Sequence, residues 1–381
     1  MRSSTEGTRR TAAVRIPPAA RAVLVVFLLY LFLVGVAFLE AGIASLGKGF
    51  QEALLRSVSH PVSGLCAGLL ATVLVQSSSV STSTIVGMVG AGTLPLALAV
   101  PMIMGANIGT TVTSTLASLG SIRRADEFRR AFAAATVHDF FNLMAVAALL
   151  PLELATGFLS RMAAWLTEFV GRAGVSATEM SKSPIRQAVK LPVGWAEDLL
   201  SAGPLTAFVL LGLGLGSIFV ALAFITRNMR RLVAGGVERV MNRVIGGGGG
   251  LVGILVGIGV TVAVQSSSIT TSILVPLVAA GVLSLRSAYP ITLGANVGTT
   301  ITALIASLAV LRPEGLTIAL VHTLFNVVAL AVVYPVPQVR VIPIRLAELL
   351  AEAAARRHRL VFAYVVTVFL VMPLLGIFLI Q

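Results

Sequence analysis

Two copies of one polar tetrapeptide carry the most chemistry in this chain. Gln76-Ser77-Ser78-Ser79 returns 189 residues later as Gln265-Ser266-Ser267-Ser268. Serine hydroxyls and the unpaired N–H groups at a helix N-terminus can together bind an anion without a charged side chain. If each tetrapeptide opens a helix, two such helix ends could converge on one anion. A catalytic serine is disfavoured, because no His or Lys recurs near both copies at a spacing suited to activating it.

The repeat extends past the serines to a second polar segment. The two copies, residues 76–120 and 265–309, align without a gap and are identical at 24 of 45 positions. Gly109 and Gly298 permit a helix to unwind there, which predicts a broken helix in each copy. Oxygen ligands for a hard cation such as sodium would come from Asn107, Thr110, Thr111, Asn296, Thr299 and Thr300. Packing between membrane helices is the alternative role for such small polar residues, but two copies at identical spacing favour a binding site.

A weaker sequence similarity follows each copy. His138 and Asn142 correspond to His322 and Asn326, and the four-residue spacing puts each His and Asn on one side of a helix. Hydrogen bonding between helices is an equally good role for the histidines.

Asp139 lacks a counterpart in the second copy, where Thr323 stands. An acid inside an apolar helix indicates function by default, so Asp139 could add a cation site in one copy only. The structural alternative is an ion pair with Arg129 or Arg130.

Composition predicts an all-α polytopic membrane protein. Hydrophobic residues make up 57% of the chain and charged residues 11%, against about 25% charged residues in soluble domains. Several apolar runs reach the roughly 20 residues that a spanning helix needs. Spanning segments are expected at about residues 21–46, 96–119, 131–151, 205–226, 288–311, 316–336 and 360–380. The net charge of +13 comes from arginines clustered in short connectors, as expected for loops kept on the cytoplasmic side. Nucleic acid is not an expected partner, since aromatic side chains do not alternate with the arginines.

Both tetrapeptides lie between apolar flanks of about 15 residues, which are too short to span comfortably. Each is therefore expected at the tip of a re-entrant helical hairpin that faces protein or a cavity. The predicted layout is a cytoplasmic tail (1–20), a first transmembrane repeat (21–169, hairpin 61–94), an extracytoplasmic linker (170–203) and a second transmembrane repeat (204–381, hairpin 251–283). Whether residues 152–169 span or lie at the surface is left open.

Charge gives this layout an orientation. With the N-terminus inside, the arginine clusters all fall on the cytoplasmic side and the charge-balanced linker falls outside. The first hairpin then enters from outside and the second from inside, so the two repeats have inverted topology. In this layout the C-terminus is expected on the extracytoplasmic side. The expected location is the cell inner membrane, with the lipid bilayer as a partner.

Several motifs resemble those of the type II sodium-phosphate cotransporters. They are Val75–Ser79, Ile103–Thr110, Glu127–Phe132, Thr136–Asn142, Ala288-Tyr289-Pro290, Tyr334-Pro335-Val336-Pro337 and Pro343-Ile344-Arg345, and the resemblance covers roughly residues 60–155 and 245–380. It implies uptake of inorganic phosphate coupled to sodium, with alternating access between inverted repeats. An acid after the helix histidine is typical of electrogenic members, so Asp139 suggests net charge movement.

The resemblance implies that the two tetrapeptides meet at the phosphate and that sodium is bound by Gln265, Ser266, Thr299 and Thr302. Together with the repeated polar residues, the expected phosphate ligands are Gln76, Ser77, Ser78, Ser79, Gln265, Ser266, Ser267, Ser268, Asn107 and Asn296. In the first copy, the expected sodium ligands are Thr110, Thr113, Asp139 and Asn142. Sodium is the co-transported ion, no organic cofactor is expected and the protein is not expected to be an enzyme.

Other functions remain open from the residues alone. Helix N-termini recognise charge and shape, so another oxyanion such as sulfate or arsenate could be the substrate. Protons could replace sodium, the two hairpins could form an anion channel, or the protein could sense phosphate without moving it. A homodimer is also possible.

Overall fold

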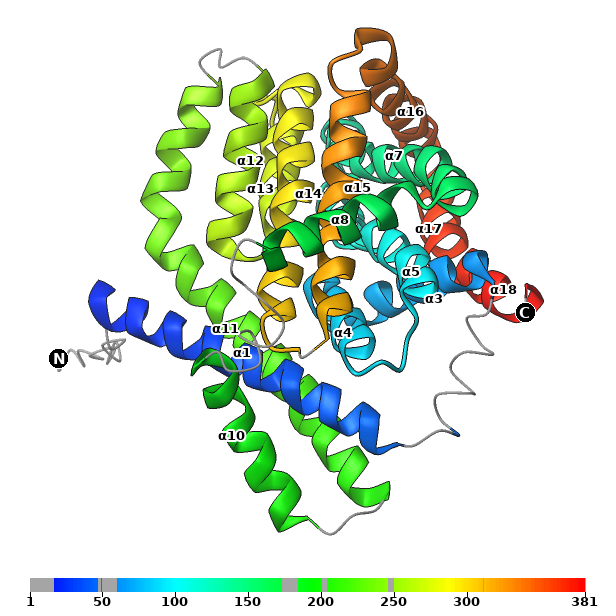
Figure 1. Ribbon diagram of the computed structural model, residues 1–381. Coiled ribbons are helices and arrows are strands. Elements are labelled where there is room, and N and C mark those ends of the chain that lie inside the picture. Colours follow the sequence, from blue (N-terminus) through cyan, green and yellow to red (C-terminus); the bar gives the residue numbers. More distant parts are fainter. Residues whose placement is uncertain are drawn as a thin grey trace, which may run out of the picture.

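The computed structural model describes residues 17–46, 49, 60–172, 184–200, 204–245, 250–310 and 312–380. Within these ranges the chain is helical and contains no strand (Figure 1). Residues 1–16 of the predicted tail, and residues 173–183 and 201–203 of the predicted linker, lie outside the described residues.

The first half of the chain contributes eight of these elements. They are α1 (Pro18–Ser45), α3 (Pro61–Val75), α4 (Ser78–Gly90), α5 (Leu96–Gly109), α6 (Val112–Ser118), a 3₁₀ turn (Leu119–Ser121), α7 (Ala125–Thr156) and α8 (Phe158–Arg172). The second half contributes α10 (Pro184–Leu199), α11 (Pro204–Ile245), α12 (Gly250–Val264), α13 (Ser267–Ala279), α14 (Leu285–Ser307), α15 (Pro313–Val333), α16 (Pro337–Arg356), α17 (Arg359–Val366), a π-helical turn (Thr367–Val371) and α18 (Met372–Leu379).

Six helical segments of the described chain are long and apolar enough to cross a membrane. They are Ala19–Ser45, Leu96–Ser121, Ala125–Thr156, Leu205–Met229, Pro313–Val333 and Arg359–Leu379. The expected span 288–311 corresponds to α14, which has 23 residues but is not among the six. Its Asn and Thr side chains lower its mean hydropathy, and most of them are buried against neighbouring helices.

Residues 152–169, whose placement the sequence leaves open, divide between two helices. Gly157 has a φ of +61° and ends α7, a left-handed conformation that glycine adopts at little cost. The carboxylate of Glu153 then accepts a hydrogen bond from the backbone N–H of Leu159 at 2.6 Å and bonds to Ser160. A carboxylate beside the start of a helix satisfies the free N–H groups there, so Glu153 fixes the start of α8. This helix has 15 residues and is not among the six candidate spans.

The two halves interlock through the second helices of the two hairpins. α4 packs against α14 and α15 of the second half, and α13 packs against α6 and α7 of the first. The Arg130 guanidinium contributes to the second contact, because its Nε donates to the backbone oxygen of Ala279 at 2.8 Å. A cation on the last carbonyls of α13 is favourable. Each tetrapeptide is thereby held by helices of both halves.

The prediction of a broken helix is wrong for the second copy. In the first copy α5 ends at Gly109 and α6 begins at Val112, whereas α14 is continuous through Gly298. Glycine permits unwinding but does not impose it. At both positions the glycine has another reason to be small: a Cβ would lie 2.8 Å from the Cβ of Thr72 or Thr261 on the neighbouring helix.

Close backbone packing of α12 on α14 predicts a stability effect. A Cβ at Gly294 would collide with the carbonyl oxygen of Ile254, so Gly294→Ala is expected to destabilise the protein by about 1–3 kcal/mol through overpacking. Gly259→Ala on α12 is the matched control, because a Cβ there meets nothing within 4 Å. Thermal unfolding of the purified protein in detergent is the measurement, and equal melting temperatures for the two variants would contradict the expected packing.

Candidate functional site

The two tetrapeptides adopt nearly the same backbone geometry. Gln76 and Gln265 both have a φ of 55°, and they are the two non-glycine residues with positive φ in the described chain. Such residues are uncommon outside functional or tightly determined turns. Each glutamine caps its own helix, since Nε2 donates to the backbone oxygen of Val73 at 2.6 Å or of Val262 at 2.7 Å. The chain then turns sharply, and α4 and α13 each begin two residues after the glutamine, at Ser78 and Ser267.

All eight residues of the two tetrapeptides line one cavity of about 240 Å³. The first turns of α4 and α13 therefore border the same space, as the sequence predicts for two converging helix ends. α11 contributes another wall through Phe219, Leu222, Ala223 and Thr226. Ser267 belongs to the lining, and its buried hydroxyl has no hydrogen-bond partner among the residues that the structure describes. Because an unpaired buried hydroxyl is costly, Ser267 is a donor available to a ligand in this cavity.

Two threonines connect the tips to the second repeated segment. Thr113 donates to Oε1 of Gln76 at 3.3 Å, and Thr302 donates to Oε1 of Gln265 at 3.1 Å. Ser79 of the first copy also reaches Thr302 of the second, with 3.5 Å between the hydroxyl oxygens. These neutral oxygen atoms are of the kind that bind sodium, and they lie beside the cavity.

Thr110 and Thr299 have a different arrangement. Their hydroxyls donate to the carbonyl oxygens of Ala106 and Ala295, each at 3.0 Å, within their own helices. Thr111 and Thr300 bond in the same way to Ile108 and Val297 at 2.8 Å. The hydroxyl hydrogens are thus occupied locally, while the oxygen lone pairs stay free to accept or to bind a cation.

Four asparagines form a buried network where the halves meet. Asn296 donates to Oδ1 of Asn142 at 2.8 Å, and Asn326 donates to Oδ1 of Asn107 at 3.2 Å. Asn142 also donates to the backbone oxygen of Asn107 at 2.8 Å. All four side chains are at most 2% exposed. Asn107 and Asn296, expected to contact the anion, and Asn142, expected to bind sodium, therefore lie in this network and not among the residues lining the cavity.

Asp139 is fully buried and does not meet an arginine. Its Oδ2 accepts hydrogen bonds from the hydroxyl of Tyr364 at 2.7 Å and from Thr115 at 3.5 Å. Oδ1 has no hydrogen-bond partner within the described chain. The alternative of an ion pair with Arg129 or Arg130 finds no support, since Arg130 bonds to Ala279 and none of the ion pairs among the described residues includes Asp139.

Comparison with known proteins places this arrangement in a family. A family model described as Na+/Pi-cotransporter matches residues 31–173 and 207–342. The chain belongs to this family. Both tetrapeptides, both threonine-containing segments and Asp139 fall within the matched ranges, so every sequence-predicted site residue lies in the part that the family shares.

Curated members of the family are about one-third identical to this chain. The sodium-dependent phosphate transport protein 2A of Rattus norvegicus is 35% identical over 418 residues, covering 91% of this chain and 65% of that protein. The corresponding protein of Ovis aries is 33% identical over 91% of this chain and 65% of its own length. Protein 2B of Homo sapiens is 33% identical over 93% and 64%. This chain therefore spans about two-thirds of the length of these relatives. No solved structure matches it.

Two contributors to the site were missed by sequence reasoning. The cavity wall from α11 consists of ordinary apolar residues that look like any spanning helix, and only their contact with the tetrapeptides distinguishes them. Tyr364, the partner of Asp139, lies beyond the range that the family model matches. A signal for it was present, because a tyrosine inside an apolar helix usually brings its hydroxyl to a polar partner.

Proposed function

We propose that this chain is a sodium-coupled transporter of inorganic phosphate. The observation that carries the proposal is the single cavity lined by both Gln-Ser-Ser-Ser segments, with the unpaired Ser267 hydroxyl at its wall. Two helix N-termini and six serines supply hydrogen-bond donors for a phosphate dianion. The cavity lining contains no Lys or Arg, so phosphate would not form a salt bridge that binds it too tightly for release. The names of the relatives, sodium-dependent phosphate transport proteins, support the same substrate and ion.

Sodium would bind beside the phosphate. Gln265, Ser266, Thr299 and Thr302 are the proposed ligands in the second copy. Thr110, Thr113, Asn142 and Asp139 are the proposed ligands in the first. The sodium charge partly neutralises the phosphate, so each ion is bound better when the other is present, and this coupling is reciprocal. The four asparagines lie on α5, α7, α14 and α15 and do not line the cavity, so they would not contact the phosphate in the conformation described here.

The proposed transport cycle uses two inverted-topology repeats with re-entrant hairpins. α3 with α4 would enter the membrane from outside and α12 with α13 from the cytoplasm, with the N-terminus cytoplasmic and the C-terminus outside. Alternating access would move the unit that carries the hairpins past α1 and α11, which pack along each other. Asp139 would make the cycle electrogenic in the cell inner membrane.

The deciding experiment is uptake of radiolabelled phosphate into proteoliposomes that contain the purified protein. Under an imposed inward sodium gradient we expect uptake well above that with potassium, and stimulation by an inside-negative potential. Sulfate in excess is expected not to compete, whereas phosphate is. Flux that needs no cation gradient would indicate a channel, uptake driven by a proton gradient alone would indicate proton coupling, and either result would overturn the proposal.

A further inference from the structure

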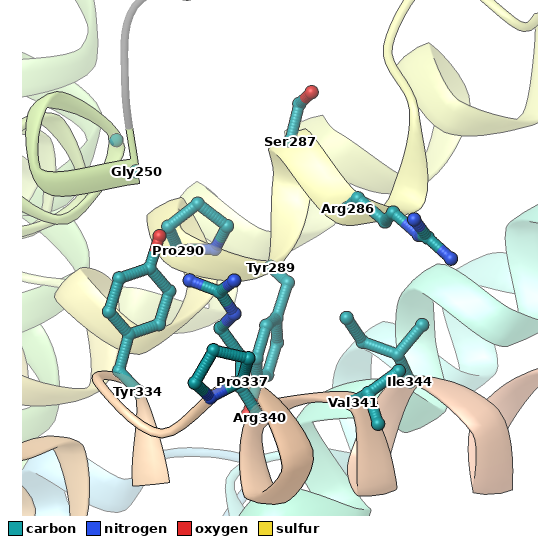
Figure 2. A pocket seen from close by; sticks show the side chains of 11 residues that line it. Gly250, Arg286, Ser287, Tyr289, Pro290, Tyr334, Pro337, Arg340, Val341 and Ile344 are labelled. Carbon is teal, nitrogen blue, oxygen red and sulfur yellow. The ribbon is translucent and has the colours of Figure 1, made fainter.

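A second polar pocket lies apart from the tetrapeptide cavity. It has a volume of about 380 Å³ and is formed where the start of α12, the start of α14 and the start of α16 meet (Figure 2). The polar or glycine residues that matter in its lining are Gly250, Arg286, Ser287, Tyr289, Tyr334 and Arg340. None of its lining residues is shared with the tetrapeptide cavity, so it is a separate candidate site.

The pocket is cationic. Two arginines and no carboxylate belong to its lining, and none of the ion pairs among the described residues involves Arg286 or Arg340. The Arg340 guanidinium carbon lies 5.0 Å from the ring centroid of Tyr334, which orients the side chain through a cation–π contact. Figure 2 shows the guanidinium beside Tyr334 and below Pro290, while Arg286 extends the other way, above Val341 and Ile344.

Hydroxyl and backbone groups surround the Arg340 guanidinium. The Tyr334 hydroxyl lies so close to Gly250 that a Cβ there would collide with it, and Gly250 is the first residue of α12. The free N–H groups of a helix start favour an anion. Tyr289 also lines the pocket, and its buried hydroxyl has no hydrogen-bond partner among the described residues. The pocket therefore holds a hydroxyl that a ligand could pair.

The fold itself does not require these residues. The repeat offset of 189 residues places Ala97 at the position equivalent to Arg286, and Val100 at the position equivalent to Tyr289. Both copies nevertheless pack the corresponding helices together, α3 on α5 and α12 on α14. The second copy thus carries charge and hydroxyls at places where the first copy folds with small apolar side chains.

We propose that this pocket binds a phosphate-bearing anion at a site separate from the tetrapeptide cavity. Arg340 would be its main ligand, Arg286 would lie at the mouth, and the start of α12 would supply N–H donors. Guanidinium groups match phosphate oxygens in a two-pronged geometry. The phosphate is either that of an anionic lipid headgroup or free phosphate. α14 carries both Tyr289 and Thr302, roughly 20 Å apart at 1.5 Å per residue, so a ligand here would touch the helix that also borders the tetrapeptide cavity.

The test is calorimetric binding to the full-length protein in detergent, with two probes. The lipid arm uses dihexanoyl-phosphatidylglycerol, with the zwitterionic dihexanoyl-phosphatidylcholine as its control. The second arm uses inorganic phosphate with Ser267→Ala protein, which weakens the other phosphate site. Arg340→Gln is expected to weaken binding of the occupant about tenfold, the effect of losing a charge-assisted hydrogen bond. Arg345→Gln on the same helix removes an equal charge outside the pocket and is expected to have no effect.

The two arms identify the occupant. Arg340-dependent binding of phosphatidylglycerol alone indicates a lipid headgroup, and Arg340-dependent binding of inorganic phosphate indicates a free anion; both support the site. If Arg340→Gln does not fold, Arg286→Gln replaces it, since Arg286 is exposed. The proposal would be overturned if the pocket variant, Arg340→Gln or Arg286→Gln, bound both probes with the same affinity as Arg345→Gln. Because the readout is binding and not uptake, this result is independent of whether the chain transports phosphate.

Discussion

Ser267→Ala is expected to reduce sodium-driven phosphate uptake by about ten- to a hundredfold. Ser267 is 2% exposed and belongs to the lining of the cavity that both tetrapeptides share, and its hydroxyl is unpaired among the described residues. A hydrogen bond from such a donor to a charged ligand contributes about 1.5–3 kcal/mol, and each 1.4 kcal/mol corresponds to a factor of about ten. Removing a hydroxyl that has no protein partner leaves no other group unsatisfied, so folding should be unaffected.

Ser83→Ala is the matched control for this prediction. Ser83 lies on α4, is fully buried and also has an unpaired hydroxyl, but it does not line the cavity. Initial rates of radiolabelled phosphate uptake, at equal amounts of reconstituted protein, should therefore stay near the wild-type value for Ser83→Ala. Equal losses in both variants would mean that the serines act through helix packing, and an unchanged rate in Ser267→Ala would remove the cavity from the transport path.

Local patterns predicted the helices and the breaks between them well. The tetrapeptides at residues 76–79 and 265–268 fall where α3 gives way to α4 and α12 to α13, as expected for polar residues between two short apolar runs. Re-entry of these helix pairs into the membrane stays a prediction. The expected first span and last span likewise match α1 and the segment Arg359–Leu379. Length and polarity are properties of a segment alone, so they can be read without knowing its neighbours.

Partners between segments could not be predicted in this way. The sequence indicated that Asn142 and Asn326 face one side of their helices, but not that each would pair with the asparagine of the other copy. It offered arginines as partners for Asp139, whereas Tyr364 occupies that position. It also suggested a broken helix at Gly298, where close approach to Thr261 explains the glycine. Each outcome depends on which helices meet, which tertiary packing decides.

The crosswise asparagine pairs link the two halves. Asn107 and Asn296 belong to the helices that carry the threonines, while Asn142 and Asn326 belong to α7 and α15. Unpaired polar groups in a buried network are costly, so a shift of one half relative to the other would have to exchange these bonds for others. In the conformation described, the network joins α5, α7, α14 and α15.

Asp139→Asn is expected to retain sodium-driven uptake and to remove its dependence on membrane potential. Asp139 is the acid at the centre of α7, and its carboxylate has one oxygen without a hydrogen-bond partner. A sodium ion bound there would carry one elementary charge across the membrane, worth about 2.3 kcal/mol per 100 mV. The amide of Asn is neutral, so the cation would no longer be needed. At an inside-negative potential of about 100 mV, this energy corresponds to a factor of roughly fifty. Uptake by the wild type should therefore exceed uptake by the variant by up to that factor.

Two further variants separate this charge effect from a structural one. Asp126→Asn removes an exposed acid from the first turn of the same helix and is expected to keep the wild-type dependence on potential. Tyr364→Phe leaves the Asp139 carboxylate in place and removes its 2.7 Å hydrogen bond, so uptake should stay electrogenic while the affinity for sodium changes. Uptake rates are measured in proteoliposomes with the potential set by potassium and valinomycin. A potential dependence that survives in Asp139→Asn would assign the charge movement to the sodium ligands beside the tetrapeptides, because those are the other proposed cation positions.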